Sequence, residues 1–159
     1  MRICIGADHA GFALKEAVRD HLSAAGHEIS DVGAFSEDSV DYPLVAEQVG
    51  RAVAEGSADI GVLVCGTGLG MAIAANKVRG VRAVQVNTPE FASMARRHND
   101  ANVITLAGRS IGQSDAFATV EAFISTEFEG GRHQQRVEQI SAIEESQICS
   151  MDMTLKREA

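Results

Sequence analysis

The sequence predicts a three-layer α/β/α sandwich around a five-stranded, parallel, Rossmann-like sheet. Short apolar runs alternate with amphipathic segments from the first residues to about residue 145, and five of these runs have the length of strands. Parallel neighbours need helical crossovers, and the crossover helices cover both faces of the sheet. A chain of 159 residues is enough for one such domain. We place this domain at residues 1–147 and expect a C-terminal tail at 148–159.

The first half of the chain contains three predicted strands, each followed by a helix. The segment 58–65 (ADIGVLVC) is almost continuously apolar, which is typical of a central strand buried on both faces. Gly26 and Gly56 can end the first two helices, and Pro43 favours the start of the second. We expect strands at 2–6, 27–32 and 58–65, and helices at about 12–25, 43–55 and 71–78.

The second half contains two more strands. Val137 and Ile140 mark successive turns of a last helix that begins near Arg132. These patterns do not determine the strand order, but ligands of such sheets collect beyond the carboxyl ends of the strands. We expect strands at 81–86 and 102–107, and helices at 89–98, at 114–128 and from about 132.

Composition narrows the classes of partner. The formal net charge is −8, from 14 Lys and Arg against 22 Asp and Glu, which disfavours nucleic acids and anionic membranes. Aromatic residues make up only 4%, which argues against surfaces that stack bases. The three cysteines are widely spaced, so we expect neither a structural zinc site nor disulfides. No apolar run is long enough to cross a bilayer, and a reducing cytoplasm is the expected location.

The segment Cys65-Gly66-Thr67-Gly68-Leu69-Gly70 at the end of the predicted central strand is the most informative motif. Alternating glycines permit positive φ angles and expose successive N–H groups before a helix, which suits an oxyanion or a phosphate. The spacing matches neither a Walker loop nor the dinucleotide fingerprint. A tight strand-to-helix turn without a ligand explains the same pattern, so both interpretations stay open.

Cys65 is the cysteine with a chemical context. It ends the predicted central strand and faces the start of a helix, where N–H groups favour the thiolate. This placement suits a base or a nucleophile. Cys4 lies inside the first predicted strand and fits core packing, and Cys149 lies in the tail without a partner pattern.

Two polar groups flank the other strands. His98-Asn99-Asp100 brings an imidazole, an amide and a carboxylate together, so His98 can act as an acid or base and Asn99 can orient a hydroxyl. A helix C-terminal histidine followed by a turn is the structural alternative. Asp8 and His9 follow the first strand and suit substrate binding, although Asp8 can instead cap the next helix. His98 reaches the carboxyl edge of the sheet only if its helix folds back toward that edge.

A pair of arginines follows two glycines in Gly130-Gly131-Arg132-His133-Gln134-Gln135-Arg136. Arg132 and Arg136 are four residues apart, on one face of a starting helix, where two guanidinium groups can grip a phosphate. Solvated arginines paired with Glu129 or Glu138 are the alternative.

Over residues 1 to about 147 the chain resembles the type B ribose-5-phosphate isomerases. Five motifs in one order carry this resemblance: Gly6-Ala7-Asp8-His9-Ala10-Gly11, Asp41-Tyr42-Pro43, Cys65-Gly66-Thr67-Gly68-Leu69-Gly70 with Ala74-Ala75-Asn76-Lys77, Arg96-Arg97-His98-Asn99-Asp100-Ala101-Asn102, and Glu129-Gly130-Gly131-Arg132-His133-Gln134-Gln135-Arg136. The wider family includes galactose-6-phosphate and allose-6-phosphate isomerases.

The resemblance implies an aldose–ketose isomerase of the pentose phosphate pathway that works through a cis-enediolate, without metal or cofactor. Cys65 would move a proton between C2 and C1, Thr67 would assist, and His98 would open the furanose ring. Other members use a glutamate base on the nearby helix, but the first turns of this helix contain no acid. The implied substrate-binding residues are Asp8, His9, Tyr42, Gly66, Gly68, Leu69, Gly70, Asn99, Arg109, Arg132 and Arg136, with His9 and the arginines on the phosphate.

The resemblance also implies a homodimer or a dimer of dimers with shared sites. His98, Asn99, Arg132 and Arg136 would come from the subunit opposite Cys65, and the last helix would reach that neighbour. The tail at 148–159 matches no motif of the family. Two alternatives to ribose 5-phosphate isomerisation stay open: isomerisation of a six-carbon sugar phosphate, such as allose 6-phosphate or galactose 6-phosphate, and a non-catalytic module that binds a sugar phosphate.

Overall fold

Five parallel strands form a single sheet. The computed structural model describes the backbone of residues 1–155 and the side chains of residues 1–146. The strands are β1 (Arg2–Ala7), β2 (Glu28–Asp31), β3 (Ile60–Cys65), β4 (Ala83–Gln85) and β5 (Val103–Ala107). Their spatial order is β2-β1-β3-β5-β4, and every neighbouring pair is parallel. All six residues of β3 are buried, which confirms the predicted central strand.

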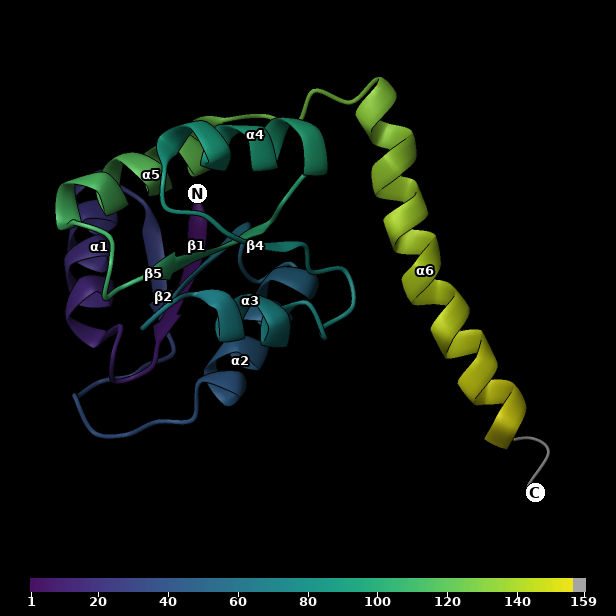
Figure 1. The fold of residues 1–159 in the computed structure, drawn as a ribbon, viewed down its shortest axis with the longest axis horizontal. Helices are drawn as coiled ribbons and strands as arrows, with labels where there is room; N and C mark the ends of the chain where they lie inside the picture. The colour runs from purple at the N-terminus through teal and green to yellow at the C-terminus, as the bar shows by residue number, and fades with distance from the viewer. Residues whose placement is uncertain (156–159) are drawn as a thin grey trace.

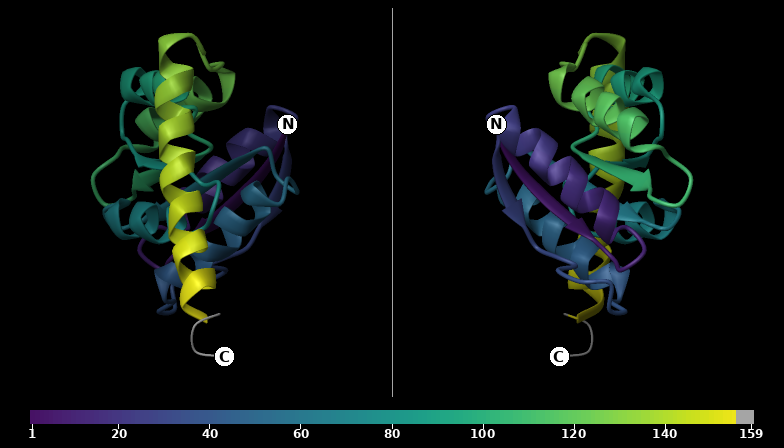
Figure 2. Two further views of the ribbon diagram at one scale, coloured as in Figure 1. Left: turned by 90° about the vertical axis from the view of Figure 1, so that its right-hand side faces the viewer. Right: turned by 90° about the vertical axis from the view of Figure 1, so that its left-hand side faces the viewer.

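Helices cover both faces of this sheet, as Figures 1 and 2 show. The helices are α1 (Phe12–Ala24), α2 (Tyr42–Ala54), α3 (Leu69–Ala75), α4 (Pro89–Asn99), α5 (Gln113–Ser125) and α6 (Arg132–Leu155). One hydrophobic cluster joins the sheet to α1, α4 and α5, and a second joins it to α2 and α3. The predicted three-layer α/β/α architecture is therefore confirmed. Among the described residues, none of the helices is long and apolar enough to span a membrane.

Two helices end earlier than the sequence predicts. α3 stops at Ala75 because the next side chain, Asn76, bonds to the edge of the sheet: it donates to the Ala83 carbonyl and accepts from the Ala83 N–H, both at 2.8 Å. α5 stops at Ser125, where the Thr126 hydroxyl donates a hydrogen bond to the Ala122 carbonyl at 2.6 Å. Both cases show side-chain hydrogen bonds competing with the helix backbone.

α6 runs down one side of the domain and lies apart from the sheet (Figure 1). It continues to Leu155, so the described part of the expected tail is helical. Val137 is buried against the body of the domain, and Glu144 accepts from the Gly80 N–H at 3.1 Å. Ile140 and Ile143 are 42% and 59% exposed, so this helix presents apolar side chains to solvent.

A fully buried lysine fastens α1 to the end of β2. The Lys15 ammonium lies 2.6 Å from the Asp31 carboxylate and 2.7 Å from that of Glu16, and the rings of Phe12 and Phe35 flank it. The other oxygen of Asp31 accepts from a backbone N–H in the following loop at 2.9 Å. A buried charge depends on such partners, because removing one leaves the other uncompensated.

We expect Lys15→Ala to lower the free energy of unfolding by about 3 kcal/mol, because Asp31 loses its buried partner. Urea unfolding followed by circular dichroism at a fixed protein concentration measures the change. Lys77→Ala removes an exposed lysine and is the matched control, with an expected change within about 0.5 kcal/mol. Equal effects of the two substitutions would contradict a structural role for the Lys15–Asp31 pair.

Candidate active site

One pocket opens at the carboxyl edge of the sheet, where β1, β3 and β5 end. Parallel strands bring their carboxyl ends to one edge, so the loops that follow them meet there. The pocket has a volume of about 340 Å³. Eight of the residues predicted for the site line it, together with Ala10: Asp8, His9, Tyr42, Cys65, Gly66, Thr67, Gly70 and Arg109.

The glycine loop after β3 lines this pocket and has a conformation that requires glycine. Gly68 has φ +77° and is the N-cap of α3. A Cβ at Gly70 would lie 2.7 Å from Cζ of Tyr42, so the tyrosine ring rests directly on the backbone there. Within the described chain, the N–H groups of Gly66 and Thr67 have no hydrogen-bond partner. The loop is a tight turn that also leaves donors free, so the two interpretations of its sequence are compatible.

Cys65 and Cys4 have different surroundings although both are buried. The Sγ atom of Cys65 accepts a hydrogen bond from the Gly68 N–H at 3.1 Å, and the residue lines the pocket. Burial, reinforced by the nearby Asp31 carboxylate, raises the pKa of Cys4 to about 11. Cys4 therefore stays protonated in the core, as its predicted packing role requires.

Asp8 closes the turn between β1 and α1. Its carboxylate accepts from the Gly11 N–H at 2.9 Å, and its own N–H donates to the Val64 carbonyl at 3.2 Å. A Cβ at Gly11 would lie 2.3 Å from that same carbonyl oxygen, so the turn packs directly on β3. Asp8 thus shapes the entrance to α1 and also presents a carboxylate, 8% exposed as a residue, to the pocket.

Arg109 supplies a cation to this pocket. The backbone N–H of Arg109 donates to the Gly66 carbonyl at 3.2 Å. A Cβ at Gly66 would lie 3.4 Å from the Cδ and Nε atoms of the Arg109 side chain. The guanidinium group is thereby held against the glycine loop. His9, exposed on the opposite loop, lines the same pocket.

Of the other predicted residues, Gly68 and Leu69 lie in the glycine loop beside the pocket, at the start of α3. The remaining four, His98, Asn99, Arg132 and Arg136, lie at the opposite edge of the sheet. α4 begins after β4 at the carboxyl edge and runs back, so His98 and Asn99 lie near the start of β5. Cys65 is in register with Ala107, at the end of that strand. His98 was expected to reach the carboxyl edge only if its helix folded back toward that edge. α4 does not do so, because a crossover helix must return the chain to the edge where the next parallel strand begins. One chain does not bring His98 and Cys65 together.

Arg132 and Arg136 lie in the first turns of α6, near His98. Arg136 donates to the Arg132 carbonyl at 2.6 Å, and the Arg132 Nε lies 3.4 Å from Nε2 of His133. The alternative of pairing with Glu129 or Glu138 is not observed: Glu129 faces Arg97 and two histidines, and Glu138 accepts from a glutamine. Among the described residues, neither arginine forms an ion pair, so both guanidinium groups are available to an anion.

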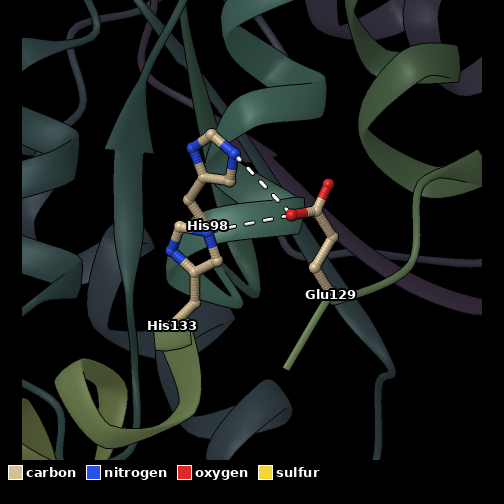
Figure 3. A group of neighbouring side chains, drawn as sticks. All are labelled: His98, Glu129 and His133. Carbon is tan, nitrogen blue, oxygen red and sulfur yellow. Dashed lines mark ion pairs between the residues drawn. The ribbon is translucent and has the colours of Figure 1, made fainter. Parts of the chain in front are cut away.

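His98 lies in a cluster that includes two residues to which the sequence assigned no role, Glu129 and His133 (Figure 3). The rings of His98 and His133 stack with centroids 4.3 Å apart and an interplanar angle of 7°. The Glu129 carboxylate lies 4.0 Å from Nε2 of His98 and 3.7 Å from that of His133. Loss of solvent contact and the nearby His98 and Arg132 lower the pKa of His133. In the sequence, the i, i+4 spacing of Glu129 and His133 was the signal that could have indicated this cluster.

Comparison with known proteins shows the family to which this chain belongs. The family model described as Ribose/Galactose Isomerase matches residues 3–140. The chain belongs to the ribose/galactose isomerase family. A relative from Escherichia coli (strain K12), ribose-5-phosphate isomerase B, is 48% identical over 144 residues, which cover 91% of this chain and 97% of the relative.

Solved structures of ribose/galactose isomerase family members share the fold. Ribose-5-phosphate isomerase B from Clostridium thermocellum superimposes with a TM-score of 0.91 at 44% identity, covering 92% of this chain and 99% of that one. The Mycoplasma genitalium enzyme, solved with bound ribulose-5-phosphate, gives a TM-score of 0.87 at 39% identity and covers 91% and 96% of the two chains.

The contrast between the two buried cysteines predicts selective alkylation. At pH 8 a thiol of pKa about 11 is ionised in only about one molecule in a thousand, so we expect iodoacetamide to modify Cys65 well before Cys4. Peptide mass spectrometry of the folded protein at successive times gives both rates. In urea the difference should disappear, which is the control. Faster labelling of Cys4 in the folded protein would contradict the assignment of Cys65 as the reactive thiol.

Proposed function

We propose that this chain interconverts D-ribose 5-phosphate and D-ribulose 5-phosphate, with Cys65 as the base. The observation that carries the proposal is the position of the Cys65 thiol, which receives an N–H hydrogen bond and lines the pocket at the carboxyl edge of the sheet. The family supports a sugar-phosphate substrate, and the relatives named above are ribose-5-phosphate isomerases.

In the proposed reaction, the Cys65 thiolate removes the proton from C2 of the open-chain aldose. The electron pair forms the C1–C2 double bond and places negative charge on the oxygen at C1. We assign the stabilisation of that charge to the N–H groups of Gly66 and Thr67, which have no hydrogen-bond partner within the described chain. Cys65 then returns its proton to C1, and the Thr67 hydroxyl moves a proton between the oxygens on C2 and C1. This sequence conserves protons and electrons and uses only groups of the protein.

We assign the remaining residues by their charge and position. Asp8 and Asn99 would bind sugar hydroxyls, Tyr42 would line the pocket, and His98 would open the furanose ring. The phosphate needs cations away from the reacting carbons, so that its binding energy positions C1 and C2 against the thiolate. We assign it to His9, Arg109, Arg132 and Arg136. These arginines would supply positive charge in a chain whose formal net charge is −8.

A site of this kind requires a second copy of the chain, because Cys65 and His98 lie at opposite edges of the sheet. We propose a homodimer, alone or within a dimer of dimers, in which His98, Asn99, Arg132 and Arg136 of one protomer complete the pocket of its partner. A twofold axis would create two such sites from the same contacts. The exposed Ile140 and Ile143 of α6 support an interface on this helix. A reducing cytoplasm, where a thiolate base survives, is the compartment we propose.

We expect Cys65→Ala to lower kcat for ribose 5-phosphate by about a thousandfold, because the reaction loses its base. Formation of the ketose, measured with EDTA present, tests this, and wild-type protein should remain active under that condition. Cys149→Ala also removes a thiol and is the matched control, with kcat unchanged. An active Cys65→Ala variant would exclude the proposed base. Binding without turnover by wild-type protein, or a higher kcat/KM for allose 6-phosphate, would overturn the proposed activity or substrate.

Shared sites predict recovery of activity in mixtures of two inactive variants. We expect Cys65→Ala and His98→Asn each to be nearly inactive alone. When the two are unfolded together in equal amounts and refolded, half of the dimers are hybrids, and each hybrid has one site with both residues intact. About a quarter of the wild-type activity should return. Each variant refolded alone is the control. No recovery, with hybrids shown by native mass spectrometry, would disprove the sharing.

A further inference from the structure

The cluster of His98, Glu129 and His133 has the composition of a metal site. These residues come from the end of α4, the loop after α5 and the first turn of α6, and one ligand atom of each lies within 4.8 Å of the other two (Figure 3). The proposed reaction uses only His98. It gives no role to a carboxylate and a second imidazole that face the same space.

We propose that His98, Glu129 and His133 bind a divalent transition-metal ion of the zinc class, and that the bound ion reversibly inhibits the enzyme by occupying Nε2 of His98. Two imidazoles and one carboxylate are a common ligand set for such ions, and three protein ligands leave a position for water. The binding site follows from the geometry of the cluster. The inhibition rests in addition on the proposed role of His98 in opening the sugar ring.

The separations are close to those that a metal ion requires. With Zn–N and Zn–O distances of about 2.0–2.2 Å, neighbouring ligand atoms lie roughly 3.3 Å apart. The Glu129 carboxylate is now 3.7 and 4.0 Å from the two Nε2 atoms, so it must approach by about half an ångström, and the stacked rings must tilt toward each other. Glu129 and His98, 46% and 31% exposed, give an ion access from solvent.

The hydrogen bonding of His133 supports its use as a ligand. Arg132 donates from Nε to Nε2 of His133 at 3.4 Å, so this ring nitrogen serves as an acceptor there, as it would toward a metal ion. This nitrogen faces the Glu129 carboxylate. A metal ion bound to Nε2 of His133 would replace the hydrogen bond from Arg132 and release its guanidinium group.

The surrounding charges predict which ions bind. Arg97 lies 3.7 Å from Glu129, so the single carboxylate is already partly neutralised. Mg²⁺ and Ca²⁺ prefer several oxygen ligands and gain little here. Zn²⁺, Co²⁺ and Ni²⁺ bind imidazole well and are the expected ligands.

Co²⁺ is a suitable probe, because its visible absorption reports the ligands. We expect the full-length wild-type protein to bind one Co²⁺ per chain at this cluster, with d–d bands and without the charge-transfer band that a Cys65 thiolate would add. Glu129→Gln should weaken Co²⁺ binding by at least about tenfold, the loss seen even when a group that only orients a metal ligand is removed. Glu127→Gln changes a nearby exposed glutamate outside the cluster and should leave the affinity unchanged.

Activity measurements on the same samples test the inhibition. Zn²⁺ should stop ketose formation by wild-type and Glu127→Gln protein, EDTA should restore it, and Glu129→Gln should need at least about tenfold more Zn²⁺. Mg²⁺ should have no effect. Unchanged Co²⁺ affinity in Glu129→Gln, or a thiolate band, would overturn the site, and binding without loss of activity would overturn the inhibition. The rate measured with EDTA tests the isomerase activity separately, because the protein in that sample has no bound metal.

Discussion

The parallel direction of all five strands is the constraint on which the rest of this structure depends. It brings the ends of β1, β3 and β5 to one edge, so Asp8, Cys65 and Arg109 meet in one pocket although they are far apart in the sequence. The same rule sends each crossover helix to the other edge. His98 at the end of α4 and the arginines of α6 are therefore directed away from the pocket that their chemistry would serve.

Close backbone packing turns this edge into a defined site. The turn after β1 rests on the Val64 carbonyl, Arg109 rests on Gly66, and the Tyr42 ring rests on Gly70. The contacts at Gly11 and Gly70 leave no room for a side chain, so these two glycines hold neighbouring loops at fixed distances. The result is a thiol and backbone N–H groups in fixed positions, which the proposed stabilisation of a developing charge would require.

The sequence predicted the sheet and this pocket well because both follow from local patterns. The continuous apolar run of β3 indicated a central strand, and the residues directly after three strands lie together as expected. The position of His98 relative to the pocket was harder to predict, because the sequence pattern of a helix does not show which edge of the sheet the functional site requires its last residue to reach. The buried Lys15 could not be predicted at all, since its partner Asp31 belongs to another element and a lysine is normally exposed. Glu129 was missed because its second histidine partner, His98, belongs to another helix, although His133 lies only four residues away.

The exposed apolar side chains of α6 have a consequence for how activity depends on the amount of protein. If Ile140 and Ile143 lie in the proposed interface, every working pocket exists only while two chains remain associated. Dilution would then reduce the rate per chain, not only the total rate. Substitutions along α6 would act in the same way without changing any group that touches the sugar. In such an enzyme the concentration of the chain itself regulates catalysis.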